Sequence, residues 1–273
     1  MIGTNCKSMY SKWQLARKYI SHYFSAYSGK GHGIHSPFVY DFVRTVLQDR
    51  DAKKTLQPVE DLRRKLCHDP REIIVEDLGA GSAHDKQNKR RVASIAKHAA
   101  KSPALCRLLH SVVKKYKPAT IIELGTSLGL SGSAMMLGNP GSYLITIEGA
   151  PAVAEIASEN FKSLGLNNIE QIRGDFDQVL PGLLSSGKKC DLVFIDGNHR
   201  YEPTVHYFKM ILQSVHAETI IIFDDIHWSD GMEKAWDEIR KNPSVTCSID
   251  LFFMGMIFFR PEFREKQDFR IRF

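Results

Sequence analysis

The sequence predicts an α/β protein built on a doubly wound, mainly parallel sheet, with a helical region in front of it. The pattern changes near Pro118: from there on, strand-like and helix-like segments alternate, whereas the preceding residues show no such alternation. Strands that alternate with helices are typical of a parallel sheet covered on both faces. In addition, five successive strand-like runs end in an acidic residue or are followed by one within two residues. In such folds, ligands bind at the carboxyl ends of the strands.

Residues 1–117 are expected to form a helical N-terminal extension that caps the substrate side of the core. Ser36 and Pro37 have the residue types of a helix N-cap and first turn. Pro103 interrupts a long helical pattern. The expected helical segments are Met9–Tyr27, a segment from Ser36 to about Gln48, Pro58–Cys67 and Lys89–Tyr116.

Residues 118–260 are expected to form the core, with seven strands, and residues 261–273 a loosely held C-terminal tail. The last two strands are expected to pair as an antiparallel hairpin through Gly255. The expected strands are the run from Thr120 to Glu123, then Tyr143–Glu148, Asn168–Arg173, Cys190–Asp196, Thr219–Phe223, Val245–Phe252 and Met254–Arg260. The expected helices are Leu130–Leu137, Pro151–Leu164, Phe176–Ser185, Glu202–Ser214 and Gly231–Lys241.

Size and composition bound the class of protein. With 273 residues, of which 43% are hydrophobic, the chain can bury one large core. The net charge of +6 permits an anionic partner without requiring one. The five cysteines are widely spaced and form no Cys-x-x-Cys pair, so a zinc site and a disulfide framework are not expected. No secretory signal and no membrane-spanning run is visible, and we expect a cytoplasmic protein.

The turn after the first core strand is the most informative stretch. Glu123 is followed by Gly125 and Gly129, and then by a small-residue helix start. Residues 73–82 match an acid-x-Gly-x-Gly loop more closely, because Ser127 replaces the middle glycine of the usual pattern. However, a polar stretch follows residue 82, whereas an apolar helix and then Glu148, 23 residues after Gly125, follow the later turn. We therefore assign the cofactor loop to residues 123–129.

The blocks IIELGTSLG, LITIEG, IRGDFDQVL, DLVFIDGNHRYE and IIIFDDIHWSDGM together resemble class I S-adenosylmethionine-dependent methyltransferases. They are most similar to the metal-dependent branch that includes catechol-type and sugar O-methyltransferases. The resemblance covers about residues 118–260 and implies a Rossmann-like methyltransferase fold. It also implies S-adenosylmethionine as the cofactor and a hydroxylated small molecule or sugar as the acceptor.

Several residues are expected to bind the cofactor. Small residues in the turn allow the backbone to approach the methionine part, Glu123 is placed to hold the amino group, and Glu148 to accept both ribose hydroxyls. Asp175 would accept from the adenine amine. Each acid also has a plainer interpretation: a strand-end turn for Glu123, a solvated acid for Glu148 and a helix N-cap for Asp175. The full expected set is Glu123, Gly125, Thr126, Ser127, Gly129, Glu148, Asp175 and Asp196.

Asp196, Asp224 and Asp225 form an expected metal site. Clustered carboxylates repel unless a cation lies among them, and oxygen ligands suit Mg²⁺. The metal-dependent branch often has Asp-Asn where this chain has Asp224-Asp225, so Mn²⁺ also fits, and Asp225 is alternatively a turn cap. His199, His227 and Asp196 are the expected candidates for the base that removes the acceptor's proton; either histidine is alternatively a structural residue.

Other functions remain open at this stage. A nucleic-acid methyltransferase is disfavoured because the fourth strand continues as Ile-Asp-Gly-Asn-His and lacks the Asn/Asp-Pro-Pro pattern of base-amine methylation. A non-catalytic binding protein would not need clustered acids. An oxygenase that uses Asp and His around iron is a further alternative. We expect a small-molecule acceptor, with an anionic one permitted by the charge, no nucleic-acid partner and no membrane span; a homodimer is compatible with the sequence.

Overall fold

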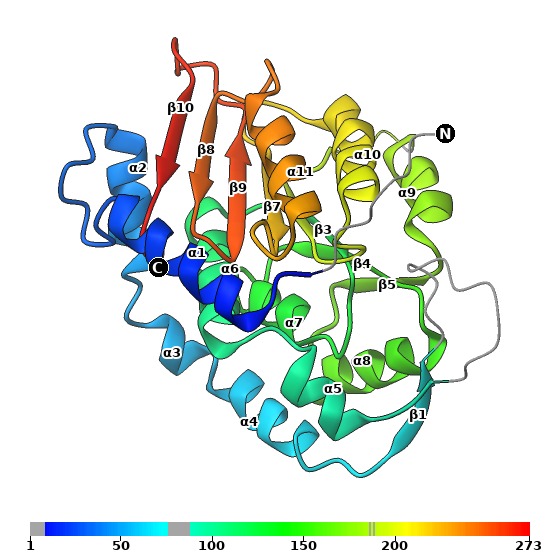
Figure 1. Cartoon of the computed structure of the whole chain (residues 1–273). Helices are drawn as coiled ribbons and strands as arrows, with labels where there is room; N and C mark the ends of the chain where they lie inside the picture. Colours follow the sequence, from blue (N-terminus) through cyan, green and yellow to red (C-terminus); the bar gives the residue numbers. More distant parts are fainter. Residues whose placement is uncertain (1–8, 76–87, 186, 188) are drawn as a thin grey trace, which may run out of the picture. The chain divides into compact units, whose positions relative to one another are not determined.

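A computed structural model describes residues 9–75, 88–185, 187 and 189–273 (Figure 1). The described chain divides into two units. The central unit comprises residues 41–183, and the terminal unit combines the described parts of 1–40 and 184–273. The segment before residue 41 therefore belongs with the C-terminal part of the chain.

Three neighbouring parallel strands lie in the central unit, namely β3 (Thr120–Leu124), β4 (Tyr143–Glu148) and β5 (Ile169–Arg173). They are connected by α7 (Leu130–Gly138) and α8 (Pro151–Ser163), and α9 (Phe176–Ser185) follows. Residue Glu123 is paired with Thr146, and Glu148 with Arg173. Because parallel strands end at the same edge, Glu123 and Glu148 come from neighbouring strand ends. These strands and helices confirm the predicted ones.

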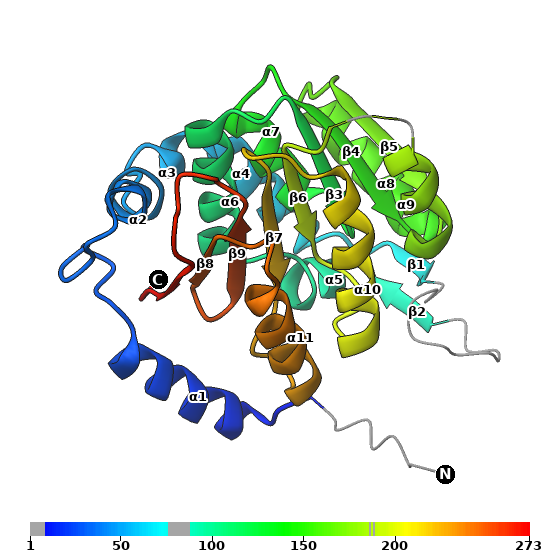
Figure 2. The same cartoon turned by 90° about the horizontal axis from the view of Figure 1, so that it is seen from above.

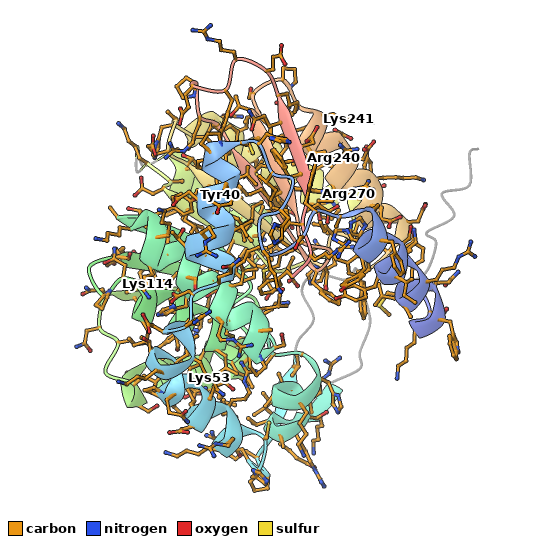
Figure 3. The ribbon with its side chains drawn as sticks, turned by 90° about the vertical axis from the view of Figure 1, so that its left-hand side faces the viewer. Tyr40, Lys53, Lys114, Arg240, Lys241 and Arg270 are labelled. Atoms are coloured by element: carbon orange, nitrogen blue, oxygen red, sulfur yellow. The ribbon has the colours of Figure 1, made fainter. Side chains whose placement is uncertain are left out.

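The rest of the central unit is mainly helical, as predicted. Pro103 does separate two helices, and Ser102 caps the second by accepting from the N–H of Leu105 at 3.4 Å. Lys114, labelled in Figure 3, holds the Asp49 carboxylate at 3.0 Å. The helices are η1 (Val43–Leu47, a π-helix), α3 (Ala52–Thr55), α4 (Gln57–Leu66), α5 (Val92–His98) and α6 (Pro103–Tyr116).

Strands β1 (Glu72–Val75) and β2 (Asn88–Arg91) pair in antiparallel fashion between α4 and α5. The sequence did not predict this pair of strands. The alternative glycine-rich loop at residues 73–82 lies outside the described residues except for its first three positions.

In the terminal unit the strand order is β10-β8-β9-β7-β6. Strands β6 and β7 are parallel, and β9 runs antiparallel to β7 and to β8. The bounds are β6 (Leu192–Ile195), β7 (Ile220–Asp224), β8 (Cys247–Asp250), β9 (Met254–Phe258) and β10 (Gln267–Arg270). The helices are α1 (Lys12–Ser25), α2 (Pro37–Phe42), α10 (Tyr201–Ile211), η2 (Leu212–Ser214, a 3₁₀-helix) and α11 (Asp230–Lys241).

The predicted β8–β9 hairpin is confirmed, but Gly255 does not form its turn. It lies inside β9, where an added Cβ would be 2.6 Å from the ring of Trp236 on α11. A second difference is β10, which pairs in parallel with β8 and is followed by the fully buried Ile271. The expected seven strands thus omit β10, and the tail after residue 260 is held by strand pairing. Among the described helices, none is both long and apolar enough to cross a bilayer.

Candidate functional site

The turn after β3 has an unusual backbone. Gly125, Ser127 and Gly129 have φ values of 104°, 48° and 76°. Left-handed backbone costs little at glycine, so two of the three positions carry the residue that such a turn favours. Serine at 127 takes the same conformation despite its Cβ. The N–H groups of Gly125 and Thr126 both donate to the carbonyl of Ile147 on β4, at 3.0 and 3.2 Å, and fix the turn against the next strand.

Gly129 is required for packing as well as for backbone conformation. A Cβ at this position would lie 2.9 Å from two ring atoms of Phe161 on α8. Gly129 is also the N-cap residue of α7. The glycine therefore lets the start of α7 approach α8 closely, and the N-terminus of α7 follows directly on the turn. Helix N-termini and successive backbone N–H groups favour negatively charged ligand groups.

Glu148, at the end of β4, contacts the turn through its carboxylate. Its Oε2 accepts from the N–H of Ser127 at 2.8 Å, and its Oε1 accepts from the N–H of Ala150 at 3.0 Å. Burial raises the pKa of Glu148, while these backbone N–H groups act in the opposite direction. A carboxylate has about four lone-pair sites, and the backbone N–H groups of Ser127, Ala150 and Gly149 occupy part of them, so room for a further donor remains.

Glu123 is completely buried and has partners within the protein. Ser131 donates to Oε1 at 2.6 Å, and Thr146 donates to Oε2 at 2.7 Å. The Thr146 hydroxyl is also 2.6 Å from that of Thr126. Burial raises the pKa of Glu123 to about 7, although the two hydroxyl donors act to lower it. These contacts join α7 and the turn to the sheet, so Glu123 helps to fix the position of the turn.

Asp175 follows β5 and occupies the N-cap of α9. Its Oδ1 accepts from the N–H of Asp177 at 2.7 Å, which is the hydrogen bond of an N-cap. The plainer interpretation of Asp175 is thus present in the structure. An adenine contact through the other carboxylate oxygen remains a proposal.

A separate acidic cluster lies in the terminal unit, at the ends of β6 and β7. Ligand atoms of Asp196, His199 and Asp224 all lie within 4.8 Å of one another. Asp224 is buried, with 1% of its surface exposed, and Asp196 and His199 are partly exposed. His199 Nε2 is 3.6 Å from Asp196 Oδ1. Two carboxylates and one imidazole at this spacing are a plausible donor set for a divalent cation.

Asp225, the third expected metal ligand, does not belong to this three-residue group. It has a left-handed backbone with φ of 53°, and its N–H donates to the carbonyl of Phe253 at 2.7 Å. His199 takes part in the cluster where the sequence suggested Asp225. Asparagine and aspartate tolerate a left-handed backbone better than most other residues do, which explains an aspartate at position 225.

His227, an expected base candidate, has both ring nitrogens engaged. Nδ1 is 2.9 Å from Glu233 Oε1, and Nε2 is 3.0 Å from Asp250 Oδ2. Burial lowers the pKa of His227, but the hydrogen bonds and charges of the two carboxylates raise it to about 9. The two carboxylates therefore favour the protonated form of His227 at neutral pH, which disfavours it as a base. Its role in catalysis stays a prediction.

The group His22, His227 and Asp250 also has the spacing of metal ligands. Here the protonated His227 already supplies the positive charge that the carboxylates need, so a cation is not required. Sequence reasoning missed Asp250 and Glu233 because neither stands at an expected strand end; Asp250 was placed inside a longer expected strand. Their partnership with His227 spans 23 and 6 residues and has no local signal.

Comparison with known proteins agrees with these features. Residues 122–226 match the family Methyltransf_24, described as a methyltransferase domain. The match begins one residue before Glu123 and includes Asp224 and Asp225. It thus spans all the expected site residues except His227, which lies one residue beyond it.

The curated relatives cover part of the chain. It is 30% identical over 131 residues to the uncharacterized protein R132 of Acanthamoeba polyphaga mimivirus, which is 44% of this chain and 58% of that protein. It is 29% identical over 143 residues to the O-methyltransferase hkm8 of Aspergillus hancockii, which is 50% of this chain and 56% of that protein. The chain thus spans a little over half the length of these relatives.

Solved structures share the fold over more of the chain. An O-methyltransferase from Bacillus cereus, crystallised in complex with SAH, covers 81% of this chain and matches over 97% of its own length. The TM-score is 0.52 and the sequence identity 21%, which shows a common fold. Residues 122–226 are therefore similar to a methyltransferase domain, and the chain shares the α/β fold of this O-methyltransferase, as its sequence predicts.

Proposed function

We propose that this chain is an S-adenosylmethionine-dependent O-methyltransferase that methylates a hydroxylated small molecule or sugar with the help of a divalent cation. The hydrogen bond between Ser127 and Glu148 carries this proposal, because it joins the left-handed turn to the acid of the next strand within the matched domain. The relative named O-methyltransferase hkm8 supports oxygen as the methylated atom.

The central unit would bind the cofactor. When bound, S-adenosylmethionine supplies an electrophilic methyl group on its sulfonium. The N-terminus of α7 suits the carboxylate of the methionine part. The remaining lone pairs of Glu148 suit the ribose hydroxyls. Glu123 would hold the turn in place, and any contact of Glu123 with the amino group would pass through a water molecule, since its carboxylate is buried.

The cluster in the terminal unit fits a divalent cation. Asp196, Asp224 and His199 present oxygen and nitrogen donors within 4.8 Å of one another. Carboxylates suit Mg²⁺, and the addition of an imidazole makes Mn²⁺ equally suitable. When bound, the cation would polarise an acceptor hydroxyl and make its proton easier to remove. Asp225 would lie next to the site without belonging to the three-residue group.

His199 is the proposed general base, with Asp196 as the alternative. Its imidazole is partly exposed, and its Nε2 faces Asp196 across 3.6 Å. A histidine has an ordinary pKa near neutrality, so a neutral imidazole can take the hydroxyl proton there. A residue that binds the cation cannot at the same time use the same nitrogen as a base. His199 therefore serves in one role or the other, and Asp196 would take the proton if His199 binds the cation.

The oxygenase alternative loses support in the terminal unit. Non-haem iron oxygenases use two histidines and one carboxylate, whereas the cluster of Asp196, His199 and Asp224 has one histidine and two carboxylates. The group of His22, His227 and Asp250 does have two histidines and one carboxylate, but both ring nitrogens of His227 are engaged by Glu233 and Asp250. The acceptor's identity and charge, a homodimer and a cytoplasmic location remain predictions.

Transfer of a labelled methyl group from S-adenosylmethionine tests the proposal. The acceptors are a catechol, a set of hydroxylated metabolites and sugars, and RNA, each with Mg²⁺, Mn²⁺ or a chelator. We expect label on a small hydroxylated acceptor, loss of transfer with the chelator, and the same loss in Asp196→Asn. The exposed Glu202, three residues beyond His199, provides the control Glu202→Gln, which should keep the activity. Label on RNA alone, or transfer that ignores the chelator, would contradict the substrate class or the role of the cation.

A further inference from the structure

Helix α1 packs one face against the terminal unit and carries large apolar side chains on its exposed face as well. The residues that face the terminal unit follow helical spacing and include Leu15, Lys18, Tyr19 and His22, of which His22 is buried and the others are half-buried. A helix on the surface of a globular protein ordinarily buries its apolar stripe and exposes its charges. In α1, large apolar side chains lie on the exposed side too.

The inner face is held by charge, by hydrogen bonds and by the ring of Tyr19, which packs against Phe252 and Phe253. Lys18 Nζ donates to both carboxylate oxygens of Glu233 on α11, at 3.0 and 2.8 Å, and the hydroxyl of Tyr10 donates to the same carboxylate at 2.9 Å. His22 Nδ1 lies 3.6 Å from Asp250 Oδ1. Figure 2 shows the beginning of α1 beside α11. The helix is thus fixed in its orientation, and the outward direction of its other face is set by these contacts.

The outer face carries large apolar side chains. Trp13, Ile20 and Phe24 are 87%, 55% and 77% exposed. Their spacing of seven and four residues places them on one stripe of a helix. Tyr23 is exposed on the same helix. Single exposed apolar residues are ordinary, but three large ones on the same stripe of one helix indicate an interaction surface.

The charge around this stripe has one sign. From Met9 to Tyr40 the chain contains no aspartate or glutamate. Lys12 and Arg17 are exposed on α1, with Arg17 placed between Trp13 and Ile20 along the stripe, and Lys30 is exposed beyond its end. Lys18 is already paired with Glu233. The partner of this face therefore needs an apolar interior and a negatively charged surface.

We propose that the outer face of α1 binds the surface of an anionic lipid bilayer, with the helix axis in the plane of the interface. Tryptophan, phenylalanine and isoleucine beside lysine and arginine are the composition of an interfacial amphipathic helix. With 14 residues, α1 is about 21 Å long, which is shorter than the hydrocarbon core, so it would lie on the bilayer and not span it.

A second copy of this chain fits the face less well. A two-fold symmetric interface places the same patch of both copies together. The cationic surroundings of the stripe would then face themselves, with Arg17 near the centre and no acid on α1 to compensate it. A bilayer containing anionic lipid matches both the apolar stripe and the charge.

Flotation with vesicles tests the proposal, and Trp13 emission serves as a second readout. Vesicles of equal parts phosphatidylglycerol and phosphatidylcholine are compared with vesicles of phosphatidylcholine alone. We expect the full chain to bind the anionic vesicles, and the combined change Trp13→Ser, Ile20→Ser and Phe24→Ser to weaken binding by at least about tenfold. Arg17→Glu should weaken it as well. The matched controls are Ile74→Ser and Lys234→Glu, which change exposed residues on β1 and α11 and should bind like the wild type.

Circular dichroism and thermal unfolding confirm that each variant is folded, which is expected because the three side chains lie on the exposed face. Failure of the folded wild type to bind anionic vesicles would overturn the proposal, and so would equal binding by the triple variant. Light scattering gives the oligomeric state: a dimer that the triple variant converts to a monomer would assign the face to a second copy and also overturn it. The test does not depend on methyl transfer.

Discussion

The backbone N–H of Ser127 donates to the carboxylate of Glu148 across 2.8 Å, between the turn after β3 and the end of β4. Ser127 makes this contact in a left-handed conformation with φ of 48°. The second carboxylate oxygen is bound to the backbone at Ala150. The turn and the acid are therefore positioned by each other before any ligand arrives, which reduces the ordering cost of binding.

Gly129→Ala should lower the free energy of unfolding by more than the strain of a left-handed alanine alone. The left-handed strain costs about 1–2 kcal/mol, and the clash of the new Cβ with Phe161 adds about 1–3 kcal/mol. The free energy of unfolding, measured with urea, gives the total. Gly165→Ala is the matched control, because Gly165 has φ of 69° and nothing within 4 Å of the added Cβ. Equal losses in both variants would show that the Gly129–Phe161 contact is unimportant.

Glu123→Gln should change how stability depends on pH. Because the pKa of Glu123 is raised from 4.5 to about 7, the folded chain keeps this proton where the unfolded chain has lost it. The stability contributed by protonated Glu123 is thus complete below pH 4.5 and decreases as the pH rises to about 7. Glutamine cannot ionise, so the variant should lose this part of the slope in urea titrations across that range. An unchanged slope would contradict the buried position of Glu123.

His227→Gln should remove a different part of the pH dependence. The folded chain keeps the His227 proton up to about pH 9, whereas the unfolded chain loses it near pH 6.5. The stabilisation is therefore present in full below pH 6.5 and is lost as the pH rises through about 9. The variant should be less stable at pH 6.5 and should show a flatter profile up to pH 9. The exposed His98 supplies the control His98→Gln, and a wild-type profile that is already flat would refute the ion-pair assignment.

Much of the fold could be predicted because its signals are local. The β3 to β5 segment alternates apolar strands with helices of ordinary length, and its turn requires glycine at Gly125 and Gly129. The β10 strand was missed although Phe269 and Ile271 alternate with charged residues, because the surrounding tail is rich in charge. Its strand conformation depends on the long-range pairing with β8, which local sequence patterns do not show.

The site could be predicted only in part, since residue types do not show which partners a side chain has in the folded structure. Glu123 was correctly placed at the strand end, but its hydroxyl partners Ser131 and Thr146 come from other elements. The sequence suggested His227 as a base, but in the structure both of its ring nitrogens are engaged by the carboxylates of Glu233 and Asp250. Likewise, the helix predicted over Met9–Tyr27 did not show which of its side chains face outward.

Calorimetric titration of S-adenosylmethionine into the full chain tests the central claim most directly. We expect binding by the wild type, and a loss of affinity on the order of tenfold or more in Glu148→Ala, because a charge-assisted contact to the ribose is removed. Glu155→Ala, an exposed acid on α8, should bind like the wild type. Absence of binding by the folded wild type, or an unchanged dissociation constant in Glu148→Ala, would contradict the assignment of this strand edge as the cofactor site.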